Sequence, residues 1–282
     1  MVQLTTSDHS RDIAGYKYIY PVMSRRAGGL SIGINLNTNN ACNWRCVYCQ
    51  VPDLVRGNAP DLDFSLLKQE LTFFIDDVKN GNFYERFEVP EQHQVIKDIA
   101  ISGNGEPTSL EGFDEAISLI GETIVKSGIK ETHQFVLITN GSLIHKSQVK
   151  KGLALLRKFQ GQVWFKLDSA TQSGRRTINN AGISGGKYFE NLLLSAQLCP
   201  TWIQTCVFAI NKQSFDVKER DSYLQFLAEA QQKVHLEGVL LYTLARPSMQ
   251  PEAKQLEKMT EPQLAEFAEE ISKIGLQVRV SA

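Results

Sequence analysis

The chain has 282 residues, of which 42% are hydrophobic and 22% charged, and its formal net charge is −1. This composition is typical of a globular protein with a sizeable core, and the small net charge does not indicate nucleic acid, which stays open as a partner. No run of about 18 apolar residues could cross a membrane, and the first residues have no apolar signal segment. We therefore expect a cytoplasmic protein with no membrane partner, in which clustered cysteines bind metal or react.

Short apolar runs alternate with amphipathic segments along the chain. Apolar residues recur with helical spacing at 67–78 and at 149–156, which predicts two helices. Asp63 and Ser147 are the residues expected to open them. A last helix is predicted from the capping box formed by Thr260 and Gln263. The predicted strands cover residues 31–37, 98–103, 134–140, 163–169, 202–210 and 234–243.

The repeated order of strand then helix predicts a parallel sheet with right-handed crossovers. Periodicity alone does not separate an open, doubly wound sheet from a curved one. We interpret the chain as an α/β protein, a partial (β/α)6 TIM-like barrel of parallel strands with outer helices. Because no linker or repeat divides the sequence, residues 1–282 are expected to form a single domain, with a core at about 18–250 and a C-terminal helix and strand at 260–282.

Unusual polar stretches follow five of the six predicted strands. In parallel α/β sheets, functional groups gather at the carboxyl ends of the strands, so these stretches are expected to meet at one edge. Turn residues are common in any loop, but five such loops on one edge favour a site over turns alone. The stretches are residues 42–49, 102–109, 139–142, 167–171 and 242–247.

Three of the five cysteines, Cys42, Cys46 and Cys49, are spaced C-x3-C-x2-C. A disulfide is disfavoured in a reducing compartment, and a redox pair of Cys46 and Cys49 would leave Cys42 without a role. Structural zinc generally takes four ligands. An iron-sulfur cluster held by three thiolates fits better, because one iron is then left open for a substrate or cofactor.

The C-x3-C-x-Tyr-C spacing, with Tyr48 before the third cysteine, resembles the radical S-adenosylmethionine superfamily. Gly105-Glu106-Pro107 is similar to that family's glycine-glutamate motif. The resemblance implies a [4Fe-4S] cluster on the three cysteines, with S-adenosylmethionine chelated at the open iron. It also implies reductive cleavage of this cofactor to a 5′-deoxyadenosyl radical, which abstracts hydrogen from a substrate.

Further blocks resemble a subgroup of iron-sulfur oxidoreductases related to the tRNA wyosine-base synthases, over roughly residues 18–250. The sequence departs from that subgroup's pattern at Met23, Asn35 and Ala245. The blocks are YPVMSRRAGGLSIGINLN (20–37), SGNGEPTS (102–109), LITNGSL (137–143), KLDSAT (166–171), IQT (203–205) and LYTLARP (241–247).

The resemblance also implies which residues bind the cofactor. Glu106 is expected to pair with its ammonium group, and Asp168 or Ser169 to bind its ribose hydroxyls. Glycines at 103 and 105 would let the backbone approach the ligand closely. The full set of candidate cofactor-binding residues is Tyr48, Gly103, Asn104, Gly105, Glu106, Thr139, Asn140, Lys166, Asp168, Ser169 and Gln204.

Arg25, Arg26 and Arg246 are candidate contacts for an anionic substrate, because guanidinium groups bind carboxylates and phosphates in bidentate fashion. Cys199 and Cys206 are too few to ligate a second cluster, and Cys206 is expected to pack in a strand as a small hydrophobe.

The sequence therefore predicts a radical S-adenosylmethionine enzyme with an unidentified substrate and an electron donor such as flavodoxin or ferredoxin. Two alternatives stay open. One is a radical enzyme that modifies a tRNA base, and the other is a zinc-stabilised binding or adapter protein.

Overall fold

One eight-stranded sheet organises the fold. The computed structural model describes residues 4, 14–24, 28–129, 134–213 and 216–282. The first two strands of the sheet are antiparallel, and every other neighbouring pair is parallel. In spatial order the strands are β1 (Ile19–Ser24), β2 (Gly29–Ile34), β5 (Ile96–Ile101), β6 (Gln134–Thr139), β7 (Gln162–Lys166), β8 (Thr201–Cys206), β10 (Gly238–Tyr242) and β12 (Val278–Ser281).

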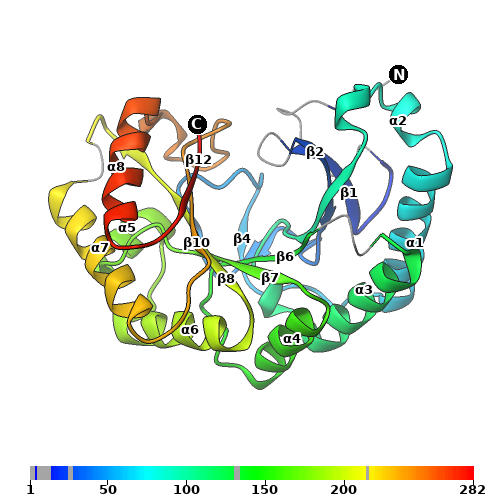
Figure 1. Ribbon diagram of the computed structural model, residues 1–282, viewed down its shortest axis with the longest axis horizontal. Helices are drawn as coiled ribbons and strands as arrows, with labels where there is room; N and C mark the ends of the chain where they lie inside the picture. The colour runs from blue at the N-terminus through cyan, green and yellow to red at the C-terminus, as the bar shows by residue number, and fades with distance from the viewer. Residues whose placement is uncertain (1–3, 5–13, 25–27, 130–133, 214–215) are drawn as a thin grey trace.

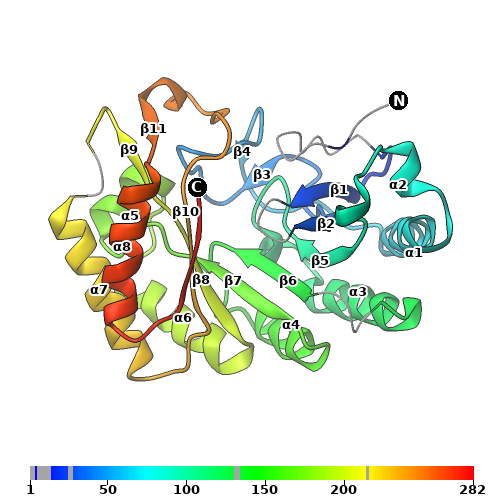
Figure 2. The same ribbon diagram turned by 45° about the horizontal axis from the view of Figure 1, so that its top comes forward.

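The sheet curls into a half-barrel whose helices lie along its outer side (Figures 1 and 2). Strands β1 and β12 form its two ends, so the predicted partial barrel is confirmed and a doubly wound sheet is not. The helices are α1 (Phe64–Asn80), α2 (Phe83–Arg86), α3 (Phe113–Ser127), α4 (Ser147–Lys158), α5 (Gln172–Asn179), α6 (Gly185–Leu198), α7 (Val217–Gln231) and α8 (Glu261–Lys273), with short 3-10 turns at Glu91–His93, Pro107–Ser109 and Ala253–Gln255.

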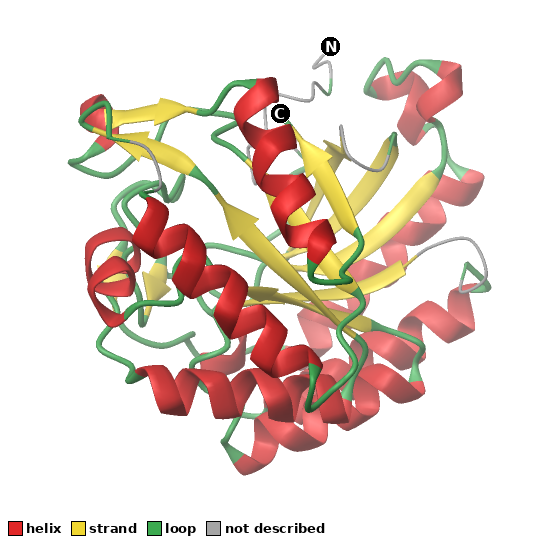
Figure 3. Ribbon diagram, turned by 60° about the vertical axis from the view of Figure 1, so that its left-hand side comes forward, coloured by secondary structure: helices red, strands yellow, loops and turns green. Residues whose placement is uncertain are grey.

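Two small sheets stand outside the half-barrel (Figure 3). β3 (Ala41–Cys42) pairs with β4 (Val55–Arg56), and β9 (Phe208–Ile210) pairs with β11 (Leu256–Lys258). The predicted strand 202–210 is therefore two strands, divided at Val207, whose N–H donates to the Tyr242 carbonyl. Within the described residues, no helix is long and apolar enough to cross a membrane.

Local capping chemistry explains where two of the predicted helices begin. The Asp63 carboxylate accepts a hydrogen bond from the Leu66 N–H at the start of α1. Thr260 and Gln263 form the predicted capping box at the start of α8. The prediction for α4 was off by one residue, because Lys146 occupies the cap position and Ser147 is the first helical residue.

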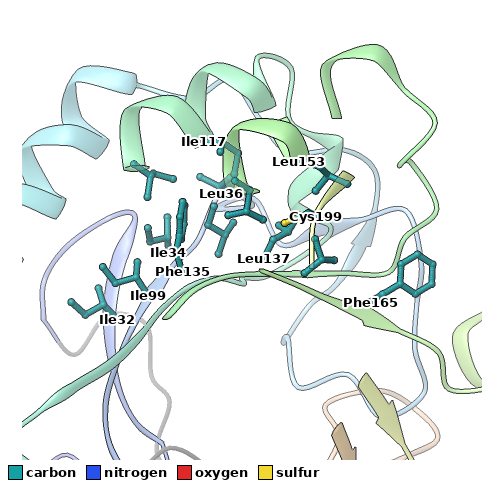
Figure 4. Packing of buried hydrophobic residues seen from close by; sticks show 14 of the residues in the cluster. Ile32, Ile34, Leu36, Ile99, Ile117, Phe135, Leu137, Leu153, Phe165 and Cys199 are labelled. Atoms are coloured by element: carbon teal, nitrogen blue, oxygen red, sulfur yellow. The ribbon is translucent and has the colours of Figure 1, made fainter. Parts of the chain in front are cut away.

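The two faces of the strands differ in what they contact. One face carries apolar side chains that pack against the outer helices, such as Ile34 and Leu137 near Ile117 of α3 and Leu153 of α4 (Figure 4). On β7 and β8, Lys166 and Gln204 are register neighbours on the opposite face, which lines the inside of the half-barrel. The barrel therefore presents polar groups inward at the carboxyl ends of its strands.

Candidate functional site

The loops after β2, β5 and β6 contact one another directly. The Glu106 carboxylate accepts hydrogen bonds from the Thr139 hydroxyl at 2.6 Å and from the Asn140 N–H at 2.7 Å. Asn43, between the first two clustered cysteines, accepts from the Asn140 amide at 2.8 Å and donates to the Ser142 hydroxyl at 2.8 Å. The expected meeting of these polar stretches at one edge is therefore observed.

Glu106 lies inside this junction. Its side chain accepts two further hydrogen bonds, from the backbone N–H and the hydroxyl of Thr108, and the residue is 2% exposed. Burial raises the pKa of Glu106, and the donors of Thr108, Thr139 and Asn140 oppose that rise. The carboxylate is thus fully engaged by groups of its own chain.

The glycines beside Glu106 are required by contacts between loops. A Cβ on Gly105 would lie 1.9 Å from the carbonyl oxygen of Ala41, and one on Gly103 would lie 2.3 Å from Asn35 Oδ1. The Asn104 N–H donates to the same Asn35 oxygen at 3.0 Å. Close approach to the chain itself therefore accounts for glycine at both positions.

Asp168 ties the ends of β7 and β8 to the cysteine segment, which we define as residues 42–49. One carboxylate oxygen accepts from the Tyr48 hydroxyl at 2.5 Å and from the Asn179 amide at 2.8 Å. The other accepts from the Cys206 N–H at 3.0 Å. Ser169 instead turns toward α7, where its hydroxyl donates to Glu219 at 2.6 Å.

A lysine lies between two aromatic rings beside Asp168. Lys166 Nζ is 5.1 Å from the ring centre of Tyr48 and 5.4 Å from that of Tyr242, whose hydroxyl it contacts at 2.9 Å. Burial by itself would lower the pKa of Lys166, but the negative charge of Asp168, 3.9 Å away, contributes to a net rise. Lys166 is therefore a fixed positive charge on the inner face of the half-barrel.

The thiols of Cys42 and Cys46 each accept a hydrogen bond from the chain. The Trp44 N–H points to Cys42 Sγ at 3.4 Å, and the Asn179 amide points to Cys46 Sγ at 3.2 Å. Burial raises the pKa of Cys46 to about 12. The pKa of Cys42 is also raised, mainly by burial and to a smaller extent by the negative charge of Glu106. In the chain alone, burial therefore favours the protonated form of both thiols.

The donor chemistry of this segment fits a soft metal centre, because thiolates favour iron-sulfur clusters and N–H donors to sulfur tune them. The ligand geometry is not assembled, since within the described residues no group of three or more His, Cys, Asp or Glu side chains is arranged to hold a metal ion.

The loop after β10 also forms hydrogen bonds with the cysteine segment. The Ser248 hydroxyl donates to the Val47 carbonyl at 2.7 Å, and the Met249 N–H donates to the Cys49 carbonyl at 2.9 Å. Glu252 adds a two-pronged ion pair with Arg45 at 2.6 and 2.7 Å. We call residues 248–252 the clamp; sequence reasoning missed it, together with Asn43 and Asn179.

The remaining candidates fall in three places. Gln204 is buried on the inner face beside Lys166. Arg246 precedes the clamp, and its carbonyl accepts from the Gln50 amide at 3.3 Å. Arg25 and Arg26 lie outside the described residues.

The two remaining cysteines are held apart. Cys199 is buried in the main core near Leu137 and Leu153 (Figure 4), whereas Cys206 packs with Val47 and Phe208. Cys199 therefore packs as an apolar side chain, at a distance from the site.

Comparison with known proteins shows the fold. No protein-family model matches the chain. Over 137 residues it is 29% identical to GTPase Obg from Brachyspira hyodysenteriae, a match that spans 48% of this chain and only 17% of that protein.

Solved structures give longer matches at low identity. A radical SAM methyltransferase from Sphaerobacter thermophilus is 12% identical with a TM-score of 0.60, over 96% of this chain and 71% of that one. A variant of spore photoproduct lyase is 10% identical with a TM-score of 0.55, over 86% and 74%. TYW1 with a lysine-pyruvate adduct bound is 16% identical with a TM-score of 0.50, over 86% and 73%. The chain therefore has the half-barrel fold found in radical SAM enzymes, as its sequence predicts.

Proposed function

We propose that this chain is a radical S-adenosylmethionine enzyme, with one [4Fe-4S] cluster held by Cys42, Cys46 and Cys49. The observation that carries the proposal is the junction in which Asn43 of the cysteine segment bonds Asn140, which in turn bonds Glu106 of the glycine-glutamate loop. Because this junction lies at the carboxyl edge of the half-barrel, it joins both motifs of the resemblance on the fold that radical SAM enzymes use.

When bound, the cluster and S-adenosylmethionine would supply the one-electron chemistry, and the protein would supply orientation and shielding. The Asn179 amide would keep its bond to Cys46 and so orient that ligand. Lys166 would hold its positive charge on the inner face of the half-barrel, next to Asp168 and Tyr48.

The binding roles divide according to where the polar groups lie. Asp168 lies beside Tyr48 and Lys166 on the inner face, whereas the Ser169 hydroxyl turns toward Glu219 of α7, so Asp168 is the better candidate for the ribose end of the cofactor. Since four donors engage the Glu106 carboxylate, we propose that it acts on the cofactor ammonium through its charge while shaping the loop. A one-electron donor such as flavodoxin or ferredoxin would be a partner.

A second candidate is modification of a tRNA base, favoured by the likeness to TYW1, a wyosine synthase. GTP hydrolysis has no support beyond the short match to Obg, because the sequence has no G-x-x-x-x-G-K-[ST] motif. Gly186-Lys187 is preceded by Ala181 where that motif needs its first glycine.

The test is release of 5′-deoxyadenosine by the anaerobically reconstituted, chemically reduced chain with S-adenosylmethionine and fractionated cell extract. We expect release, stimulated by the fraction that holds the substrate. Stimulation by the RNA fraction would favour the tRNA role, and by the small-molecule fraction a metabolite. No release with any fraction, from a chain that carries zinc and no sulfide, would favour the zinc-stabilised adapter.

A further inference from the structure

Helix α6 begins with an exposed, glycine-rich turn. The residues before and at its start read Gly182-Ile-Ser-Gly-Gly-Lys187, and Ser184 caps the helix by accepting from the Lys187 N–H. The first N–H groups of a helix have no partner within it, so those of Gly185 and Gly186 point out of its end. Apart from neighbouring residues and backbone of the same helix, no described heavy atom lies within 4 Å of where a Cβ on Gly186 would be, which leaves open space there. Such a helix start attracts anions.

A buried arginine with unused donors lies beneath this turn. Arg175 of α5 is 0% exposed, and its Nη1 donates to the Ala170 carbonyl at 2.6 Å. Within the part of the chain that the structure describes, its Nε and Nη2 have no hydrogen-bond partner. A Cβ on Gly185 would lie 3.4 Å from Nη2, which therefore points toward the first turn of α6.

The two unused donors are unusual because burying a charged group without a partner for each donor destabilises the folded protein. Tyr188 offers its ring face at 5.3 Å from the Arg175 guanidinium. The nearby Glu219 accepts from the hydroxyls of Ser169 and Thr171, and the described residues contain no ion pair between it and Arg175. An anion at the α6 turn would supply the missing partner.

A further positive charge lies in the same turn. Lys187 is 43% exposed at its side chain, and its only described ion pair, with Glu190, is a long one of 3.8 Å. Because Lys187 lies in the first turn of α6, its charge would raise the local concentration of an approaching anion.

We propose that the first turn of α6 and Arg175 form a binding site for a phosphoryl group of the substrate. Its place beside the cysteine segment follows from α5, where Asn179 lies one helical turn, roughly 6 Å, beyond Arg175 and bonds both Cys46 and Asp168. The assignment to a substrate rests on the proposed function, whereas anion binding at this turn does not.

The test is calorimetric titration and thermal unfolding of the full chain with inorganic phosphate, in the wild type and in Arg175→Met, Gly186→Asp and the control Arg176→Met. Arg176 is exposed on the same helix, so its variant loses the same charge outside the site. We expect phosphate to bind and stabilise the wild type and the control, and to bind Arg175→Met at least about tenfold more weakly, or about 1.4 kcal/mol.

The two site variants separate binding from folding. Without phosphate, Arg175→Met should be as stable as the wild type or more stable, because an apolar side chain replaces a buried charge that has no ion pair among the described residues. Gly186→Asp adds a carboxylate in open space at the helix start, where it favours the fold, and should abolish the phosphate response. Either variant binding phosphate like the wild type would overturn the proposal, as would a wild type that phosphate does not stabilise.

Two further titrations with the same variants determine which kind of substrate carries the phosphoryl group. Tighter binding of a sugar monophosphate than of inorganic phosphate assigns the group to a metabolite, and tighter binding of a short oligoribonucleotide assigns it to RNA. Either result must be lost in Arg175→Met; affinity that survives there would contradict the site. Because these titrations need no deoxyadenosine release, failure of the phosphate site and failure of the radical chemistry are seen separately.

Discussion

At the scale of single residues, the charged side chains of the site already have hydrogen-bond or ion-pair partners within the chain. Glu106 accepts from four donors, and Lys166 lies between two tyrosine rings beside Asp168. Such groups are costly to leave unpaired, so they fix the positions of the loops that carry them. Substitutions here should therefore change stability as well as ligand binding.

Replacing Glu106 by Gln should lower the free energy of unfolding by about 1–3 kcal/mol, because the new amide N–H groups face donors and leave some of them unsatisfied. Urea unfolding measures the change. Glu111→Gln is the matched control, since Glu111 is exposed in the same loop. Equal unfolding of the two variants would mean that the four donors do not hold the carboxylate.

Replacing Lys166 by Met should cost about 3 kcal/mol of stability, because Asp168 would be buried without its cation. The exposed Lys68 gives a control, Lys68→Met, expected to change stability by less than about 0.5 kcal/mol. The raised pKa of Lys166 means that its contribution is complete below the ordinary lysine range. The difference between wild type and Lys166→Met should thus stay constant below about pH 9 and shrink only in strongly alkaline solution. A difference that vanished near neutral pH would contradict this account of Lys166.

At the scale of elements, the clamp after β10 is what sets the conformation of the cysteine segment from outside. The clamp, residues 248–252, makes hydrogen bonds to backbone carbonyls of Val47, Cys49 and Val51, about 200 positions earlier in the chain. Apart from the ion pair of Glu252 with Arg45, these contacts are to backbone, so the clamp sequence carries little local signal of its partner.

Removing one of these contacts should loosen the cysteine segment without unfolding the chain. In Gln250→Ala the side-chain bond to the Val51 carbonyl at 3.0 Å is lost. Hydrogen exchange should then speed up in residues 45–51, while the thermal unfolding temperature falls only slightly. Lys254→Ala, an exposed change just beyond the clamp, should leave exchange unaltered. If both variants exchange alike, the clamp does not restrain the segment.

The six predicted strands were found because each is a short apolar run bounded by turn residues. Strand β1 was missed, since Pro21 interrupts its pattern; a proline is tolerated there because β1 is at the end of the sheet. The meeting of Glu106 with Asn140 followed from the parallel sheet. The unused Nε and Nη2 donors of Arg175 and the hydrogen bond of Asn179 to Cys46 could not be predicted. Both depend on which side chains, distant in the sequence, pack together.

At the scale of the whole molecule, the half-barrel gathers polar groups at one edge, with Lys166 and Gln204 on its inner face. The cysteine segment covers that edge, with Tyr48 reaching down to Asp168. The proposed radical chemistry would bring a cluster, a cofactor and a substrate together at this edge. The central claim is therefore that the cysteine segment binds the cluster.

The most direct test measures iron and acid-labile sulfide in the full chain after anaerobic reconstitution. We expect about four irons and four sulfides per chain in the wild type. The triple variant Cys42→Ala, Cys46→Ala, Cys49→Ala should hold essentially none, whereas the control Cys199→Ala, Cys206→Ala should keep the full content. A triple variant that retains iron and sulfide, or a wild type that binds zinc without sulfide, would contradict the account.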